Sequence, residues 1–400
     1  MSKDLFDKFQ PIIDEVASLP ADSENPFTVK MDKVFSQTEA EISGNRTILC
    51  GTNNYMGMTF NETALEAAHE ALNNFGTGTT GSRVLNGTYS GHKDLEETLC
   101  DFYNMKSAMI FSTGYQANLG ILSTLVGRDE YIIIDADSHA SIYDGCALGK
   151  ADIVRFRHND PEDLEKRLRR LPADAGKLVV VEGIYSMLGD AAPLKEICRV
   201  TKKYGASLVV DEAHSMGFTG SSGRGISQEL GVEGDVDFII GTFSKSVGTV
   251  GGFCVSSHPK FEIMRLVCRP YIFTASLPPS VVASAKAAIE TLKFGEKMRA
   301  LLWDNASKLH KNLKSSGFKL GTETPESPII AVCLDNSEIV TRFWSDLLKS
   351  GVYVNMALPP ATPNGLNLLR CSVCSSHTPE QIQTISSKFI EIGRKLKVIS

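Results

Sequence analysis

The feature that most constrains the fold is a series of short, uniformly apolar runs between residues 108 and 255. Apolar residues throughout a run, rather than at every second position, are typical of strands buried on both faces of a parallel sheet. Helical patterns separate several of the runs, for instance at 161–171 and 194–204. The sequence therefore predicts an α/β fold in which helices flank a mostly parallel, seven-stranded sheet. The predicted strands lie at 108–111, 131–134, 153–156, 178–181, 208–210, 238–240 and 253–255.

A second region follows, with a different pattern. Pro278 and Pro279 introduce a helical stretch that we expect to continue to about residue 315. Candidate strands at 329–333, 352–355 and 368–373 and a closing helix at 379–396 come after it. Because 400 residues are too many for one simple core, we expect more than one domain. The predicted division is an N-terminal segment over 1–60, a large α/β domain over 61–290 and a small α+β domain over 291–400.

Charge and hydropathy exclude several classes of protein. The chain carries 41 basic and 47 acidic residues, so it lacks the basic excess of a sequence-independent nucleic-acid binder. None of its apolar runs approaches the roughly 18 residues that a membrane-spanning helix needs. Residues 1–19 contain four acidic side chains, which is unlike a signal peptide and is typical of a short amphipathic helix. We therefore expect a cytoplasmic protein.

The nine cysteines are scattered, which is typical of reduced thiols in a cytosolic protein. Cys371 and Cys374 form one C-x-x-C pair, but a zinc site would need a second pair or histidines at ligand spacing. We expect no metal site.

Two motifs match the residue patterns of nucleotide-binding sites but lack the neighbouring elements that such sites need. Residues 76–81 fit G-x-G-x-x-G, yet they follow a predicted helix, whereas the dinucleotide motif follows a strand. Residues 211–214 spell the helicase box DEAH, but the chain has no Walker A loop to accompany it. We interpret the first motif as a glycine-rich loop and look for another use of Asp211.

Four groups of polar or glycine residues follow predicted strands, at Gly114, His139, Asp211 and Lys245. In open α/β sheets, ligands bind beyond the carboxyl ends of the strands, which is where these residues fall. Taken singly, each has a plainer interpretation: a turn, a structural histidine, a helix N-cap or an exposed loop lysine. Their occurrence together, each at a strand end, favours one shared ligand site.

One cofactor uses all four groups, pyridoxal 5′-phosphate (PLP). The helix that starts at Gly114 offers backbone N–H groups to a phosphate. Lys245 can form a Schiff base with the aldehyde, and Asp211 can keep the pyridine nitrogen protonated. The imidazole of His139 can stack on the ring. A protonated ring is an electron sink, so the pattern predicts carbanion chemistry at an amino acid.

Three longer motifs resemble the α-oxoamine synthases: residues 182–190 (EGIYSMLGD), 211–217 (DEAHSMG) and 241–245 (GTFSK). These are fold-type I PLP-dependent transferases that condense an amino acid with an acyl-CoA and release CO₂. The resemblance covers nearly the whole chain. Stretches at 135–145, 241–253, 269–279 and 353–363 are most similar to the soluble bacterial members that join L-serine to palmitoyl-CoA. That reaction gives 3-ketosphinganine and opens sphingolipid biosynthesis.

The resemblance implies a role for each matching residue. Lys245 and His139 would be catalytic, Lys245 as the residue that carries the cofactor and then removes the Cα proton. Asn54 and Arg370 would hold the carboxylate of the amino acid. Thr274 would reach the cofactor phosphate of a neighbouring subunit, which implies a homodimer with shared active sites. The residues that would contact the cofactor are Gly114, Tyr115, His139, Glu182, Ser186, Asp211, His214, Thr242, Ser244, Lys245 and Thr274.

One departure from the family concerns Leu358, because similar bacterial enzymes carry an arginine there that is expected to help hold the carboxylate. Its replacement keeps open an α-oxoamine synthase that uses glycine or alanine with another acyl-CoA. A non-catalytic subunit of the same fold is a further alternative, but such a subunit has no need of Lys245. A PLP-fold transcription regulator would need a DNA-binding domain for which the chain has no room.

Residues 260–269 alternate basic and apolar side chains. This pattern suits either a helix that buries its apolar face in a dimer or a peripheral contact with the inner membrane face. The sequence favours the dimer and leaves the membrane contact open.

Overall fold

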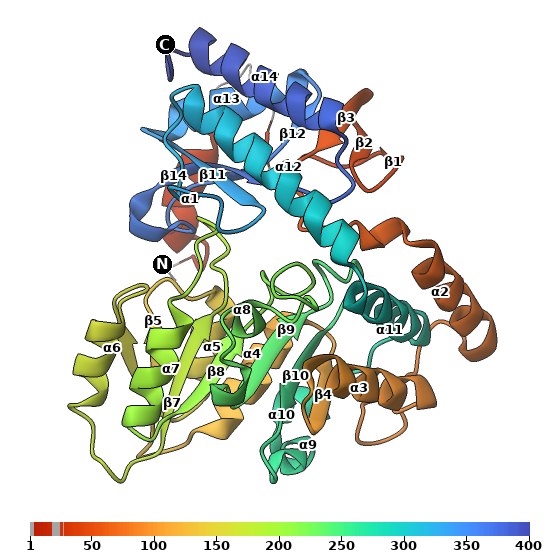
Figure 1. Ribbon diagram of the computed structural model, residues 1–400, viewed down its shortest axis with the longest axis vertical. Coiled ribbons are helices and arrows are strands. Elements are labelled where there is room, and N and C mark those ends of the chain that lie inside the picture. Colours follow the sequence, from red (N-terminus) through yellow and green to blue (C-terminus); the bar gives the residue numbers. More distant parts are fainter. Residues whose placement is uncertain (1–3, 18–24, 27) are drawn as a thin grey trace.

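The computed structural model describes residues 4–17, 25–26 and 28–400 and contains a seven-stranded sheet with helices on both faces (Figure 1). The strand order is β4-β10-β9-β8-β7-β5-β6, and all pairs are parallel except those of β10, which runs antiparallel to both neighbours. The predicted fold class is confirmed. The strands are β4 (Ser107–Phe111), β5 (Tyr131–Asp135), β6 (Asp152–Phe156), β7 (Lys177–Glu182), β8 (Ser207–Asp211), β9 (Phe238–Thr242) and β10 (Gly252–Ser256).

Successive residues of the central strands enter two different cores, as the period of two in a strand requires. In β5, Ile132 and Ile134 pack with α4 (Gly114–Leu125) and α5 (Ala140–Leu148). Ile133 points to the opposite face, among residues of α6 (Pro161–Leu168) and α7 (Leu194–Lys203). The uniformly apolar sequence therefore reflects burial on both faces.

The prediction of full burial is wrong for β6, in which Ile153 is 45% exposed. This strand lies at the edge of the sheet, beside β5 alone. An edge strand has a neighbour on one side only, and here the helices leave part of it uncovered. A run of apolar residues does not by itself reveal this position.

The predicted long helix after Pro278 is two helices, α11 (Pro279–Lys293) and α12 (Glu296–Ser315). The interruption falls at Phe294 and Gly295, and glycine is a poor helix former. α11 packs against α2 (Glu62–Phe75) and α3 (Ser90–Tyr103), whereas α12 packs against α14 (Pro379–Lys395). The break lets the chain pass from the helices of the large sheet to the C-terminal part, which Figure 1 shows in blue above them.

The C-terminal part holds a three-stranded antiparallel sheet in the order β11-β14-β13. Its strands are β11 (Ile329–Leu334), β13 (Asn355–Ala357) and β14 (Asn367–Ser372). α12 and α13 (Ser337–Lys349) pack against it, and α14 packs on these two helices. β12 (Val352–Tyr353) instead joins the N-terminal strands β1 (Lys33–Val34), β2 (Glu39–Ile42) and β3 (Asn45–Leu49), in parallel with β3. The predicted division at residues 60 and 290 stays a proposal, and this pairing groups residues 33–49 with the C-terminal part.

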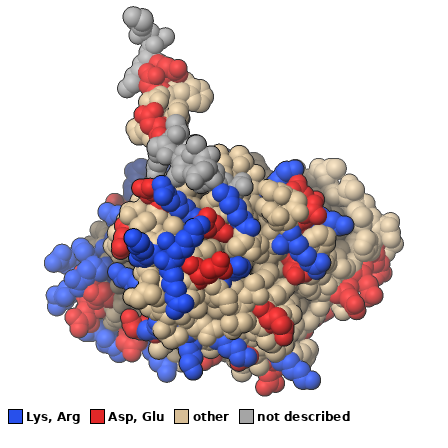
Figure 2. All heavy atoms as spheres, turned by 90° about the horizontal axis from the view of Figure 1, so that it is seen from above, with Lys and Arg blue, Asp and Glu red and all other residues tan. Residues whose placement is uncertain are grey.

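The predicted N-terminal helix is observed as α1 (Gln10–Ala17), preceded by the 3₁₀ turn Asp7–Phe9. Residues 1–3 and 18–19 of that prediction lie outside the described residues. The side chains of residues 4–14 are exposed, and Figure 2 shows this segment rising from a surface on which basic and acidic side chains are interspersed. Across the described ranges, the helices are all too short or too polar to cross a membrane. The remaining short helices are α8 (Ile226–Glu229), α9 (Met264–Val267), α10 (Arg269–Ile272) and the 3₁₀ turns Met58–Phe60, Glu233–Asp235, Phe261–Ile263 and Pro363–Gly365.

Candidate active site

Two cavities meet at the carboxyl ends of the central strands. The smaller has a volume of about 250 Å³ and the larger about 680 Å³, and both are lined by His139, His214 and Lys245. These residues follow β5, β8 and β9, and the parallel register places Glu182 beside Asp211 at the same edge. The structure therefore brings the predicted strand-end residues together. The smaller cavity is also lined by Thr113, Gly114, Tyr115, Asn118, Ser141, Glu182, Asp211, Ala213, Gly241, Thr242 and Ser244.

The N-terminus of α4 forms one wall of the smaller cavity. Thr113 caps the helix by accepting a hydrogen bond from Gln116 N, so the N–H groups of the first turn point outward. A Cβ on Gly114 would lie 2.8 Å from Thr242 Cβ, which leaves no room for a side chain. Free N–H groups at the positive end of a helix, on a residue without a side chain, form a cradle for a phosphate.

A chain of hydrogen bonds joins Asp211 to His139 across this cavity. Asn118 Nδ2 donates to Asp211 Oδ2 at 2.8 Å and to Ser141 Oγ at 2.9 Å. Ser141 Oγ lies 2.8 Å from His139 Nδ1, and Ser141 N donates to the same nitrogen at 3.2 Å. Because Nδ1 accepts this backbone N–H, a neutral His139 carries its proton on Nε2. The network holds a carboxylate and an imidazole in fixed positions.

Burial lowers the pKa of His139, so the neutral form prevails. Its backbone N–H donates to Glu182 Oε1 at 2.6 Å. Burial also raises the pKa of Glu182 well above its ordinary value, and the charge of Asp211 acts in the same direction. Two adjacent carboxyl groups at one strand edge are thus kept from ionising together.

Lys245 is half-buried where the two cavities meet. Burial lowers the pKa of its ammonium to about 8, although the carboxylates of Asp211 and Glu182 oppose the shift. An amine with such a pKa is partly neutral near physiological pH. It can therefore act as a nucleophile toward an aldehyde or as a base.

Arg370, on β14, is 5% exposed and lines the larger cavity. It donates to Ser186 O at 2.5 Å, to Asn53 Oδ1 at 3.2 Å, to Ser372 Oγ at 2.8 Å and to Tyr55 Oη at 3.1 Å. All four acceptors are neutral, and among the described ion pairs no carboxylate faces this guanidinium. A buried cation beside a cavity, without a counter-charge of its own, is suited to bind a carboxylate ligand.

Some predicted residues occupy other places. Asn54 lines neither cavity, because its amide nitrogen donates to Thr59 Oγ1 at 2.8 Å, and its neighbour Asn53 lines the larger cavity instead. Ser186 lines the larger cavity alone, whereas Tyr115 does line the smaller one, although it is 44% exposed and its hydroxyl is bonded to Asp144. Thr274 lies outside both cavities of this subunit.

Comparison with known proteins agrees with this geometry. The family model "Aminotransferase class I and II" matches residues 46–389. The chain belongs to this family. A serine palmitoyltransferase of Sphingomonas paucimobilis is 59% identical over 398 residues, which cover 99% of this chain and 95% of that protein. A serine palmitoyltransferase of Caulobacter vibrioides is 54% identical over 99% of this chain and 98% of that protein. A structure of the S. paucimobilis enzyme with a bound PLP–myriocin aldimine has a TM-score of 0.98 and 58% identity, over 99% of this chain and 100% of that one.

Within this aminotransferase family, the chain is an α-oxoamine synthase similar to the bacterial serine palmitoyltransferases. The sequence analysis gave no role to Tyr55, Asn53, Asn118 or Ser141. Asn118 and Ser141 lie four and two residues after Gly114 and His139, two of the predicted strand-end residues, so the sequence did carry a signal for them. Tyr55 and Asn53 lie outside every predicted helix and strand and had none.

Proposed function

We propose that this chain is a PLP-dependent serine palmitoyltransferase, which condenses L-serine with palmitoyl-CoA to 3-ketosphinganine, CoA and CO₂. The observation that carries the proposal is the junction of the two cavities at Lys245. The smaller cavity fits a planar phosphorylated aldehyde, and the larger combines Arg370 with an apolar wall. The similarity to serine palmitoyltransferases extends over nearly the full length of both chains.

The smaller cavity has a suitable residue for the phosphate, the pyridine nitrogen and the aldehyde of PLP. The α4 N-terminus at Gly114 would receive the phosphate, with the Ser244 hydroxyl as a donor beside it, while Thr242 donates its own hydroxyl to Gly251 O at 2.9 Å. Asp211, held by Asn118 and by the N–H of Ala213, would stabilise a proton on the pyridine nitrogen. When bound, PLP supplies an electron-poor ring that accepts the electrons released at the amino acid Cα.

The residues around Lys245 then perform separate tasks. The amine of Lys245 would hold the aldehyde covalently and, once displaced by the incoming amino acid, would take the proton from Cα at Nζ. His139 would cover the ring and orient the substrate through its Nε2–H. The Asp211–Asn118–Ser141–His139 network fixes that orientation.

Arg370 would bind the serine carboxylate. Its Nε donates to Ser186 O, which fixes the plane of the guanidinium. Nη1 donates to Asn53 and Ser372 and Nη2 donates to Tyr55, so one N–H group of Nη2 is left to bind the carboxylate. Leu358, the residue that replaces an arginine of similar enzymes, lines the same cavity. Arg370 would therefore be the main carboxylate ligand in this chain.

The outer wall of the larger cavity is apolar and would receive the acyl chain of the thioester. An acyl chain is stabilised when it leaves water against such a wall. Lys245 lines the same cavity, so the thioester carbon would lie within reach of the reacting amino acid. The residues of this wall are Ile12, Pro26, Met187, Met356, Ala357, Leu358, Pro359, Pro360 and Ala361.

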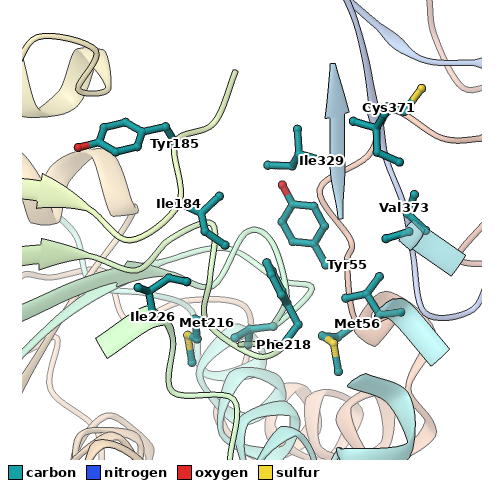
Figure 3. Close-up of a cluster of buried hydrophobic side chains, with 14 of the residues drawn as sticks. Tyr55, Met56, Ile184, Tyr185, Met216, Phe218, Ile226, Ile329, Cys371 and Val373 are labelled. Carbon is teal, nitrogen blue, oxygen red and sulfur yellow. The ribbon is translucent and has the colours of Figure 1, made fainter. Parts of the chain in front are cut away.

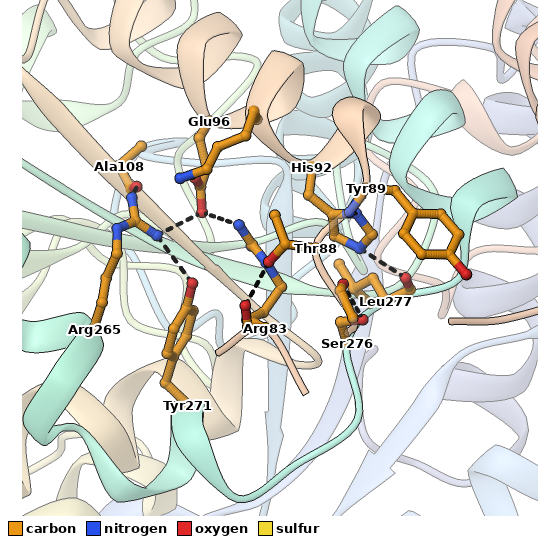
Figure 4. A network of polar contacts seen from close by, with 12 residues as sticks. Arg83, Thr88, Tyr89, His92, Glu96, Ala108, Arg265, Tyr271, Ser276 and Leu277 are labelled. Atoms are coloured by element: carbon orange, nitrogen blue, oxygen red, sulfur yellow. Dashed lines mark hydrogen bonds and ion pairs between the residues drawn. The ribbon is translucent and has the colours of Figure 1, made fainter. Parts of the chain in front are cut away.

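We propose a homodimer with shared active sites. Thr274 lines neither active-site cavity of its own subunit and follows Phe273, which is 71% exposed. Figure 4 shows how this segment is fixed: Arg83 and Arg265 both bind Glu96, and Arg265 also donates to Tyr271 at 3.0 Å. The position of half-buried Thr274 beside this network, away from both active-site cavities of its own subunit, supports the proposal that it serves the cofactor of a second subunit.

We propose a cytoplasmic location. For the membrane contact that the sequence left open, basic side chains should face the lipid headgroups. Arg265, at the centre of that stretch, is instead held by Glu96 and Glu262, whereas Lys260 and Arg269 are exposed near Ile263 and Leu266. Because the central basic side chain is withdrawn to acidic partners, we favour a protein partner over a membrane for the apolar face.

Product analysis tests the proposed function. The purified enzyme, loaded with PLP, is offered L-serine, glycine or L-alanine, each with a series of acyl-CoA lengths. We expect 3-ketosphinganine from L-serine and palmitoyl-CoA as the fastest product in the mass spectrum. Faster turnover of glycine or alanine would identify another α-oxoamine synthase instead.

A further inference from the structure

Tyr55 lies between the two halves of the candidate site. Its ring is fully buried and packs edge-on against Phe218, with ring centroids 5.2 Å apart. Figure 3 shows the ring beside Phe218 and Met56, with the hydroxyl directed away from both. The apolar contacts fix the ring, so the hydroxyl can reach only the polar groups around it.

Three polar side chains surround the hydroxyl. Tyr55 Oη lies 2.9 Å from His214 Nδ1 and 3.2 Å from Asn53 Oδ1, and it accepts a hydrogen bond from Arg370 at 3.1 Å. His214 lines both cavities, and Arg370 lines the larger one. One hydroxyl therefore contacts both a residue of the cofactor cavity and the residue suited to bind a carboxylate.

The hydroxyl has one proton, which can go to His214 Nδ1 or to Asn53 Oδ1. Asn53 Oδ1 already accepts a hydrogen bond from Arg370 at 3.2 Å. If the tyrosine proton went to Asn53, a neutral His214 would have to carry its proton on Nδ1 to bond with Tyr55 Oη. Tyr55 Oη would then accept from His214 in addition to the Arg370 guanidinium. A donor cation also polarises the hydroxyl and makes it a better donor. The shorter contact, to His214, agrees with this direction.

We propose that Tyr55 is a positioning residue that donates to His214 Nδ1, keeps the His214 proton on Nε2 and couples this proton to Arg370. The Nε2–H would then point toward the cofactor cavity and donate to the phenolic oxygen of the cofactor. Burial lowers the pKa of His214 well below its ordinary value, so the ring is neutral and its tautomer matters. The inference rests on the proposed function for the identity of the cofactor, but the tautomer is a property of this chain.

The proposal predicts a spectroscopic effect. The negative charge of the phenolic oxygen stabilises the protonated form of the lysine–cofactor linkage. A hydrogen bond donated to this oxygen reduces that charge and therefore lowers the pH at which the linkage loses its proton. In Tyr55→Phe, His214 loses its fixed tautomer and this donor weakens. We expect the pH midpoint of the visible absorption band to rise by about one unit, a tenfold change in the protonation equilibrium.

The matched control is Tyr103→Phe, which also removes a buried hydroxyl. Tyr103 packs against Phe102 and Phe253, and its hydroxyl has no hydrogen-bond partner within the described part of the chain. This variant should leave the midpoint of the band unchanged.

A second measurement reads the tautomer directly. In the PLP-loaded enzyme labelled with ¹⁵N-histidine, the signals of His214 are assigned by their loss in His214→Asn. We expect a protonated Nε2 and an unprotonated Nδ1 in the wild type, and a mixture in Tyr55→Phe. A proton on Nδ1 in the wild type, or an unchanged band midpoint in Tyr55→Phe, would overturn the inference. A wild type that takes up no PLP would overturn the proposed function, while the ¹⁵N signals of the unloaded protein would still decide the tautomer.

Discussion

Arg370 Nε donates to the backbone carbonyl of Ser186 at 2.5 Å, across 184 positions of the chain. This bond ties β14 of the C-terminal part to the loop after β7 of the large sheet. It fixes the guanidinium beside the larger cavity, where Nη2 keeps one N–H group beyond its bond to Tyr55. The candidate carboxylate site is therefore assembled from two distant parts of the chain.

Arg370→Lys should weaken the binding of L-serine. The single ammonium of a lysine cannot reach both the Ser186 carbonyl and a carboxylate in the cavity, whereas the guanidinium can use different nitrogens for the two. Loss of one hydrogen bond to a charged group, worth about 1.5–3 kcal/mol, corresponds to a roughly tenfold to hundredfold higher dissociation constant. Spectral titration of the PLP-loaded enzyme with L-serine measures it. Arg299→Lys is the control, because Arg299 is equally buried and bonded to carbonyls, but lies outside both cavities.

Leu358→Arg should strengthen the binding of L-serine. The side chain lines the cavity of Arg370, so a second guanidinium there could share the carboxylate. We expect the KM for L-serine to fall by about tenfold, the worth of one charge-assisted hydrogen bond. Leu358→Met, which conserves volume without adding charge, should leave the KM within about twofold. An unchanged KM in the arginine variant would mean that Leu358 does not face the carboxylate.

Gly114→Ala should reduce the affinity for PLP. The added Cβ would lie 2.8 Å from Thr242 Cβ and 3.0 Å from Thr242 Oγ1, and Thr242 is held in the buried strand β9. A collision at the helix terminus displaces the N–H groups that would receive the phosphate. We expect at least a roughly tenfold higher dissociation constant in a fluorescence titration with PLP. Gly234→Ala, where an added Cβ meets nothing within 4 Å, should bind PLP as the wild type does.

His158 predicts a pH dependence of stability. Its Nδ1 lies 2.9 Å from Asp135 and its Nε2 lies 2.7 Å from Asp190. Burial alone would lower the pKa of His158, but these two carboxylates outweigh it and raise the pKa to about 10. Because the folded-state pKa is raised, this contribution is complete below pH 6.5, declines as the pH rises and is lost above about pH 10.

The measurement is urea denaturation of wild type and His158→Gln across this range. We expect the difference in unfolding free energy to shrink by on the order of 3 kcal/mol between pH 6.5 and pH 10. Glutamine can still form hydrogen bonds but carries no charge, so the variant isolates the effect of protonation. Asp137 is the other acidic group near the imidazole ring, with its carboxylate 3.9 Å from Nδ1. A difference that stays constant with pH would show that His158 is not held protonated.

Much of the large sheet follows from local sequence. Each of its seven strands lies within two residues of the predicted apolar run, because burial on both faces leaves an unbroken apolar signal. The break at Gly295 was missed because a single glycine is tolerated inside a helical pattern. The exposed position of β6 depends on strand order, and the pairing of β3 with β12 joins segments about 300 residues apart, so no local pattern carries either feature.

The same distinction applies to the candidate site. Lys245, Asp211 and His139 follow predicted strands, so their meeting at one sheet edge could be expected from the sequence. Tyr55 is separated from His214 by 159 positions and Asn118 from Asp211 by 93. Such partners are determined by how elements pack against each other, which a local sequence pattern does not show. For the same reason the sequence did not reveal that Asn53, rather than its neighbour Asn54, lines the larger cavity.

The central claim is that Lys245 carries PLP covalently. Borohydride reduction of the PLP-loaded enzyme, followed by proteolysis and mass spectrometry, tests it directly. The account predicts one pyridoxyl adduct, on the peptide that contains Lys245, and no adduct with loss of the colour in Lys245→Ala. An adduct on another lysine, or a wild-type peptide map without any, would contradict it.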